Sequence, residues 1–152
     1  MIRLLILIFL TLFPIAPQAR AQTAADSVAL RQTALDYIEG WYTGDADRMA
    51  QAVHTTLVKR IVATHPTTGE QVFRDQDSTA LVTATKRGYG TKVPDVRRQK
   101  AITILDVFEG AASVKIVAAD WVDYLHLVKQ DGEWQIINLL WEKKPRRGQT
   151  GP

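Results

Sequence analysis

Residues 120–141, which read DWVDYLHLVKQDGEWQIINLLW, constrain the fold more than any other stretch of the chain. Two runs rich in Val, Leu, Ile, Tyr and Trp flank Asp131 and Gly132, and Asp-Gly is a strong short-range signal for a β-hairpin. Successive strand residues point to opposite faces, and the second run is apolar on both. One face carries Trp134, Ile136, Asn138 and Leu140, and the other carries Ile137, Leu139 and Trp141.

A strand of an ordinary antiparallel sheet needs only one apolar face. We therefore expect both faces of this strand to be covered, one by helices from earlier in the chain and the other by a second subunit. Asn138 is a lone amide among apolar neighbours, and it must find a hydrogen-bond partner if it is buried.

The chain opens with MIRLLILIFLTLFPIAPQARAQ, which has the layout of a secretory signal. Arg3 gives a basic start, residues 4–16 form an apolar run, and residues 19–21 (Ala-Arg-Ala) fit a small-x-small cleavage site. The run is shorter than the ~20 residues of a membrane-spanning helix, and two prolines interrupt it. We predict a cleaved signal peptide over residues 1–21, export by the general secretory route to the periplasm or medium, and no stable membrane anchor.

The composition limits how the mature chain can be stabilised and what it can bind. There is no cysteine, so the core alone must hold this exported domain together. Removing residues 1–21 leaves 17 basic and 16 acidic residues, and much of the excess lies in Lys143-Lys144-Pro145-Arg146-Arg147. No aromatic residues interleave with these charges, so we expect no nucleic-acid binding. The prediction is one domain over residues 22–145 and a flexible basic tail over residues 146–152.

Periodicity predicts helices early in the chain and strands late. A helix is expected over residues 28–42 with Asp26 or Ser27 as N-cap, and Asp45 can cap a short second helix through Met49 and Val53. The remaining expected elements are strands at 57–63 and 71–74, a helix from Asp77 or Ser78 to about Arg87, and strands at 100–108, 112–119, 121–129 and 134–141. This order predicts an α+β domain in which a curved antiparallel sheet forms a cone around the helices, with a pocket between the layers.

Two blocks of residues resemble the nuclear transport factor 2-like superfamily, and within it the "putative lumazine-binding" branch. The first block is Tyr37-Ile38-Glu39-Gly40-Trp41-Tyr42-Thr43-Gly44-Asp45 with Met49 and His54. The second is Asp123-Tyr124-Leu125, Leu127, Lys129, Asp131-Gly132, Trp134, Ile136 and Asn138. The chain departs from the pattern at Val53, where Phe is usual, and at Leu139, where Lys is usual. The resemblance implies a cone-shaped, cystatin-like fold that often dimerises through the open face of its sheet. It implies little chemistry, because the superfamily includes isomerases, dehydratases, hydrolases, adaptors and binding proteins.

The first functional hypothesis is an exported, dimeric module that holds an apolar or aromatic small molecule between helices and sheet. The hypothesis is based on the aromatic pair Tyr37 and Trp41 on the first helix. This pair is expected to face a part of the sheet that carries Tyr124, His126 and Asn138. These five residues are the predicted ligand-binding set.

Two alternatives stay open. An isomerase or dehydratase would need a base in an apolar cavity, for which Asp106 and His54 are the candidates. A domain without a pocket would instead bind another protein through the open sheet face. The three histidines stand in no metal-binding spacing and no cysteine can join them, so we expect no metal and no cofactor.

Overall fold

The computed structural model describes residues 18–145. Its elements, in chain order, are α1 (Gln18–Thr43), α2 (Ala46–Ala52), β1 (Val53–Thr64), β2 (Gln71–Asp77), α3 (Ser78–Lys86), η1 (Gly90–Lys92), η2 (Asp95–Arg97), β3 (Lys100–Phe108), β4 (Ala111–Ala118), β5 (Trp121–Gln130) and β6 (Glu133–Lys143). The predicted order of helices and strands is confirmed. Most of the predicted signal peptide and all of the predicted basic tail lie outside the described residues.

Two of the predicted helix caps are confirmed, and one is wrong. The carboxylates of Asp45 and Asp77 accept hydrogen bonds from the first turns of α2 and α3. Asp26 does not begin a helix, because α1 already starts at Gln18. Its carboxylate instead accepts hydrogen bonds from the Lys129 amine at 2.7 Å and the Trp134 indole at 3.0 Å, so it joins α1 to the sheet.

The six strands form one open sheet in the order β2-β1-β6-β5-β4-β3. All neighbouring pairs are antiparallel except β1 and β6, which run parallel, so the sheet is mixed and not wholly antiparallel as predicted. The parallel pair arises because the last strand returns to lie beside the first. Asp131 and Gly132 form the predicted tight turn, with φ angles of 53° and 89°.

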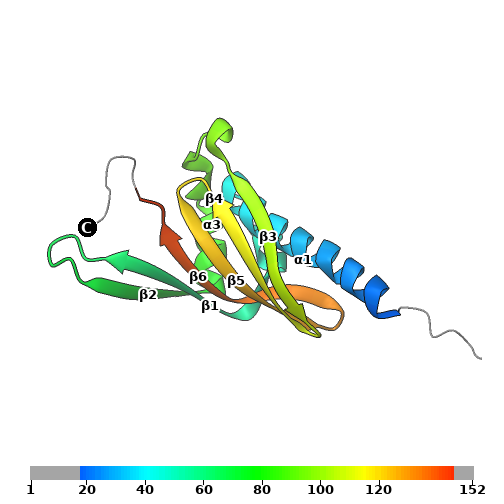
Figure 1. Ribbon diagram of the computed structural model, residues 1–152. Coiled ribbons are helices and arrows are strands. Elements are labelled where there is room, and N and C mark those ends of the chain that lie inside the picture. Colours follow the sequence, from blue (N-terminus) through cyan, green and yellow to red (C-terminus); the bar gives the residue numbers. More distant parts are fainter. Residues whose placement is uncertain (1–17, 146–152) are drawn as a thin grey trace, which may run out of the picture.

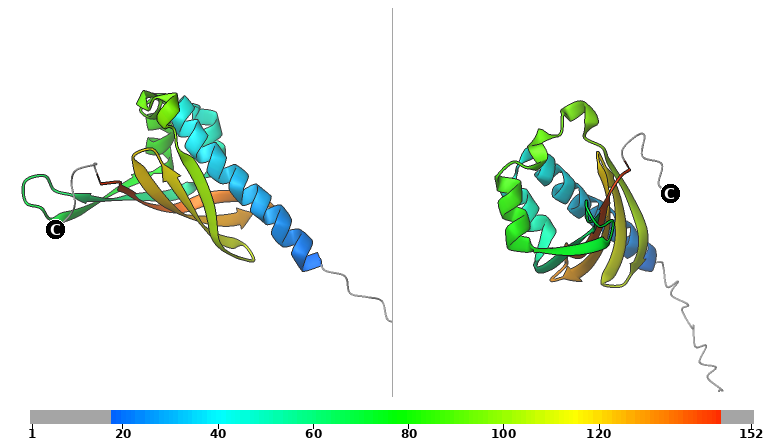
Figure 2. Two further views of the ribbon diagram at one scale, coloured as in Figure 1. Left: turned by 45° about the horizontal axis from the view of Figure 1, so that its top comes forward. Right: turned by 90° about the vertical axis from the view of Figure 1, so that its left-hand side faces the viewer.

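The helices cover one face of the curved sheet, which gives the predicted α+β cone (Figures 1 and 2). α1 lies along the concave side of the sheet, and α2 and α3 pack at its end. The core between the layers includes Leu30, Tyr37, Ile38, Met49, Leu57, Leu81, Ile116, Leu125, Ile136 and Leu139. The β1–β2 hairpin projects beyond the helices.

A β-bulge changes which residues of β6 face the helices. His126 pairs with Asn138 and Leu127 pairs with Ile136, so Ile137 is the extra residue. Because one extra residue reverses the alternation, Leu139 points into the core while Asn138 is exposed. The expectation that Trp134, Ile136, Asn138 and Leu140 share one face is therefore wrong beyond Ile136.

Within residues 18–145, no helix combines the length and the apolar character that crossing a bilayer requires.

Candidate functional site

A lysine, a tyrosine and an aspartate from three different elements meet inside the cone. Lys59 comes from β1, Tyr37 from α1 and Asp123 from β5, and their exposed fractions are 7%, 2% and 0%. Strand alternation places two of them there: Lys59 follows buried Leu57 by two residues, and Asp123 precedes buried Leu125 by two. Two charged side chains therefore lie where strand alternation would ordinarily place apolar ones.

The amine of Lys59 lies among aromatic rings. Its Nζ donates a hydrogen bond to the Tyr37 hydroxyl at 2.8 Å. The same nitrogen lies 5.3 Å, 5.6 Å and 5.3 Å from the ring centroids of Tyr37, Trp41 and Trp141. Burial lowers the pKa of Lys59, and the negative charge of Asp123 opposes that shift. The rings favour an ammonium by cation–π attraction, whereas desolvation favours the neutral amine.

The carboxyl group of Asp123 is only half satisfied by the protein. Oδ2 accepts a hydrogen bond from the Trp121 indole Nε1 at 2.7 Å. Oδ1 is buried and makes no hydrogen bond of ordinary geometry among the described residues, although the carboxyl group also interacts with the Tyr37 hydroxyl. Burial raises the pKa of Asp123 to about 6, although the Lys59 charge and the hydrogen bonds of Trp121 and Tyr37 oppose the shift.

Tyr37 is adjacent to both ionisable partners. Burial, followed by the charge of Asp123, raises the pKa of Tyr37 well above its ordinary value, so the phenol stays protonated. Because the pKa values of Lys59 and Asp123 shift toward each other, the free-energy gap between the ammonium–carboxylate pair and the amine–carboxylic acid pair is smaller than in water. Buried groups with strongly shifted pKa values are typical of binding and catalytic sites.

The five predicted ligand-binding residues lie on two different sides of the sheet. Tyr37 and Trp41 belong to the buried cluster. Tyr124, His126 and Asn138 lie on the uncovered face, because β5 turns Asp123, Leu125 and Leu127 inward and the bulge in β6 turns Asn138 outward. Asn138 finds its partner there in the ring nitrogen Nδ1 of His126, at 3.2 Å. The expected single cavity lined by all five residues is therefore not formed.

The two candidate bases also lie away from the cluster. Asp106 is exposed on β3, where a register shift after Ile104 ends the alternation that would have turned it inward. His54 is half-buried at the start of β1, and its ring nitrogens contact Thr56 Oγ1 at 2.7 Å and Gln130 Oε1 at 3.2 Å. Neither residue faces an apolar cavity with an opposed donor. Within residues 18–145, no three His, Cys, Asp or Glu side chains group as a metal site would require.

Two residues of the cluster carried sequence signals that pointed to them. Lys59 follows Leu57 by two residues, so strand alternation predicts an inward-facing apolar residue at its position. Asp123 precedes Leu125 and Leu127 in the same way. A charged residue that interrupts an otherwise apolar strand face is costly unless it has a partner, so these interruptions could have marked the site.

Most of the block from Tyr37 to Asp45 builds the corner between α1 and α2. A Cβ on Gly40 would lie 3.1 Å from the Asp45 carbonyl oxygen, so glycine lets the two helices approach. Gly44 takes a φ of 76°, which favours glycine at the end of α1. The Tyr42 hydroxyl donates to the Gln99 carbonyl at 2.8 Å. Only Tyr37 and Trp41 of this block reach the buried cluster.

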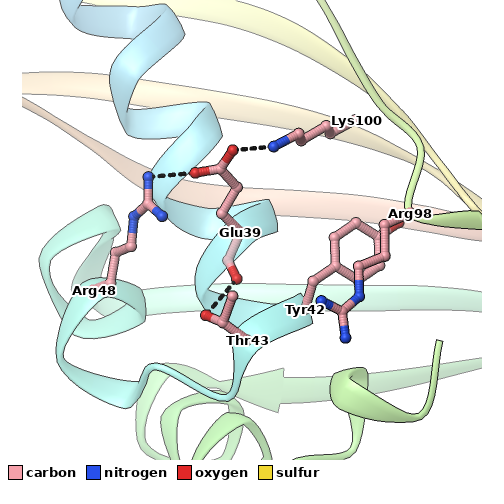
Figure 3. A pocket seen from close by; sticks show the side chains of 6 residues that line it. All are labelled: Glu39, Tyr42, Thr43, Arg48, Arg98 and Lys100. Carbon is pink, nitrogen blue, oxygen red and sulfur yellow. Dashed lines mark hydrogen bonds and ion pairs between the residues drawn. The ribbon is translucent and has the colours of Figure 1, made fainter. Parts of the chain in front are cut away.

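A hollow lies on the surface beside this corner, with a volume of about 120 Å³. Its lining consists of Glu39, Tyr42, Thr43, Arg48, Arg98 and Lys100, as Figure 3 shows. Glu39 pairs with Arg48 at 2.6 Å and with Lys100, and the Lys100 contact is the main reason that the pKa of Glu39 is lowered. Arg98 pairs with Asp95. These charges already compensate one another, so the pocket offers a ligand little unpaired charge.

The fold places the protein in the nuclear transport factor 2-like class with a cystatin-like fold. A nuclear transport factor 2-like protein of unknown function from Shewanella baltica superposes with a TM-score of 0.62 at 15% identity, over 81% of this chain and 97% of that one. A second, with a cystatin-like fold, from Novosphingobium aromaticivorans gives 0.64 at 11% identity, over 87% and 89%. A third, from Methylobacillus flagellatus, gives 0.61 at 17% identity, over 80% and 94%.

Within that class the chain belongs to the family described as "Putative lumazine-binding", whose model matches residues 25–142. The resemblance seen in the sequence is confirmed by this match. No curated protein matches the chain. The solved structures are too distant in sequence to carry more than the fold, so the function must be argued from the site.

Proposed function

We propose that this protein is a binding module that holds a small apolar or aromatic molecule between α1 and the sheet, against the cluster of Tyr37, Lys59 and Asp123. The observation that carries the proposal is the unpartnered Oδ1 of Asp123 in the protein interior. More than about 90% of buried polar groups in proteins have a hydrogen-bond partner. An orphan carboxylate oxygen beside a lysine thus favours a ligand that donates a hydrogen bond to it.

The surroundings of that oxygen indicate the shape of the ligand. The indole rings of Trp41, Trp121 and Trp141 flank the cluster and are each only partly buried. Flat aromatic side chains favour a flat partner, which they contact by stacking or edge-to-face packing. A planar heterocycle with an N–H group for Asp123 and an acceptor for Lys59 fits this arrangement.

The test is a titration of the purified mature protein with a panel of planar heterocycles that includes lumazine, followed by tryptophan fluorescence and melting temperature. We expect at least one member to quench the fluorescence and raise the melting temperature. Asp123→Ala should weaken that binding by tenfold or more, whereas Asp120→Ala, a change at an exposed aspartate nearby, should not. A saturating panel that shifts neither signal would remove the basis of the proposal.

We further propose that the uncovered face of the sheet pairs with a second copy of the chain. Tyr124 and Leu140 are cross-strand neighbours on that face, with exposed fractions of 46% and 43%, and Val58 on β1 is 39% exposed. A Leu140→Glu substitution should lower the molecular mass seen by sedimentation from dimer to monomer, while Thr83→Glu on exposed α3 should not. A wild-type monomer at high concentration would argue against this pairing.

Export of the protein remains a prediction from its first residues. Cleavage after residue 21 would shorten α1 at its start and leave the buried cluster intact, since Tyr37 lies well beyond that point. The mature protein should therefore begin at Gln22 in the periplasmic or extracellular fraction, which N-terminal sequencing can establish. An uncleaved chain in the cytoplasm would refute it.

A further inference from the structure

The buried amine of Lys59 has surroundings that differ from those of Lys100, Lys129 and Lys144. The amines of Lys100, Lys129 and Lys144 contact Glu39, Asp26 and backbone carbonyls respectively. Lys59 instead donates to a neutral phenol and lies among aromatic rings, and its closest negative group forms no ion pair with it within 4 Å. A buried amine without a contacting carboxylate loses much of the stabilisation that keeps a lysine protonated.

The same arrangement lets a proton leave the amine without leaving the site. Tyr37 accepts a hydrogen bond from Nζ and its hydroxyl interacts with the Asp123 carboxyl group, whose Oδ1 makes no hydrogen bond of ordinary geometry. Transfer of one proton from Lys59 to Asp123 converts an ammonium and a carboxylate into an amine and a carboxylic acid, with no change in net charge. Desolvation favours the neutral pair, because burying two charges costs more than burying two dipoles.

We propose that Lys59 is a nucleophilic lysine that forms an imine with the carbonyl group of an aromatic aldehyde or ketone held in the cone. This inference rests on the proposed binding function and names the reactive class of its ligand. The half-buried rings of Trp41 and Trp141 lie over Nζ, so an aromatic aldehyde or ketone that packed against them would bring its carbonyl group near the amine. Buried amines in apolar pockets are the form in which lysine acts as a nucleophile.

The step balances within the cluster. The lone pair of Nζ attacks the carbonyl carbon, the new N–C bond forms, and the oxygen takes up the proton that nitrogen loses. Asp123 then donates its proton to the hydroxyl group, the C–O bond breaks and water leaves. The second proton on nitrogen returns to Asp123 as the N=C bond forms. One amine and one carbonyl thus give one imine and one water, with Asp123 as acid and then base.

The test is reductive trapping with benzaldehyde and sodium cyanoborohydride near neutral pH, with labelled sites located by peptide mass spectrometry. We expect Lys59 to gain a benzyl group at least about twofold faster than the more exposed Lys92, Lys100 and Lys115, since burial lowers its pKa and so raises its share of neutral amine. Lys59→Arg should abolish the fast label and keep the cation, and Lys115→Met should leave it unchanged. The wild-type labelling map needs no variant, so a folding defect cannot hide the result.

Two outcomes separate this inference from the proposed function. If benzaldehyde quenches tryptophan fluorescence saturably but Lys59 is labelled no faster than the exposed lysines, the imine is overturned and the binding proposal stands. If neither benzaldehyde nor the heterocycle panel binds and Lys59 is not labelled, both the imine and the binding proposals are refuted. Asp123→Asn should lower the rate at which Lys59 is labelled per bound benzaldehyde, and a rate per bound benzaldehyde equal to that of the wild type would overturn the role given to Asp123.

Discussion

Replacing Asp123 by Asn removes a buried carboxyl group whose pKa lies above its ordinary value, so the change can be read as a pH dependence of stability. Burial raises that pKa from 3.8 to about 6. The native protein therefore holds a proton between these two pH values that the unfolded chain has already lost. The Asp123 carboxyl group therefore adds to the free energy of unfolding below about pH 4, and this contribution is lost as the pH rises to about 6.

The magnitude follows from the size of the shift. One pKa unit corresponds to 1.36 kcal/mol, so a rise from 3.8 to about 6 is worth about 3 kcal/mol. We expect the free energy of unfolding of the wild type, minus that of Asp123→Asn, to fall by about 3 kcal/mol over this window.

The assay is urea unfolding at a series of pH values from about 4 to about 7, with the free energy obtained by linear extrapolation. Asp120→Asn is the matched control, because Asp120 is exposed and pairs with Arg97 on the surface. Its difference curve should stay nearly flat. A difference curve for Asp123→Asn that is equally flat would refute the claim that this carboxyl group is protonated more readily in the folded state.

Three further perturbations have expected outcomes. Gly90→Ala should destabilise the protein by about 3 kcal/mol in urea unfolding, since its Cβ would lie 2.1 Å from the Trp41 carbonyl oxygen. Tyr42→Phe should cost roughly 1–2 kcal/mol, because its hydroxyl both donates to and accepts from the backbone. Lys59→Met should raise the pKa of Asp123 further, because the lysine charge lowers it, and carbon-13 NMR of the carboxyl group can follow this.

Two of these substitutions have a matched control variant. Gly110→Ala should cost much less than Gly90→Ala, because its Cβ would meet only the Lys129 carbonyl oxygen at 3.8 Å. Lys115→Met removes a cation that lies over the Tyr124 ring, and it should leave the Asp123 titration unchanged. If Lys59→Met lowered the pKa of Asp123, the assignment of Lys59 as its neighbouring cation would be wrong.

The sequence alone determined the elements and their order, because these depend on local pattern. Asp45 and Asp77 cap their helices as predicted, and Asp131 and Gly132 form the predicted turn. The α+β cone follows from helices early and strands late, and the two sequence blocks were sufficient to indicate the family that the family model confirmed.

Only the tertiary structure decided which side of the sheet each strand residue faces. A single extra residue at Ile137 reverses the alternation of β6 and sends Asn138 to the uncovered face, and no local pattern in the run predicts where such a bulge falls. The parallel pairing of β1 with β6 likewise depends on contacts between distant segments. That pairing brings Lys59 toward Asp123, which lies 64 positions further along the chain, so the buried cluster is a product of the folded sheet.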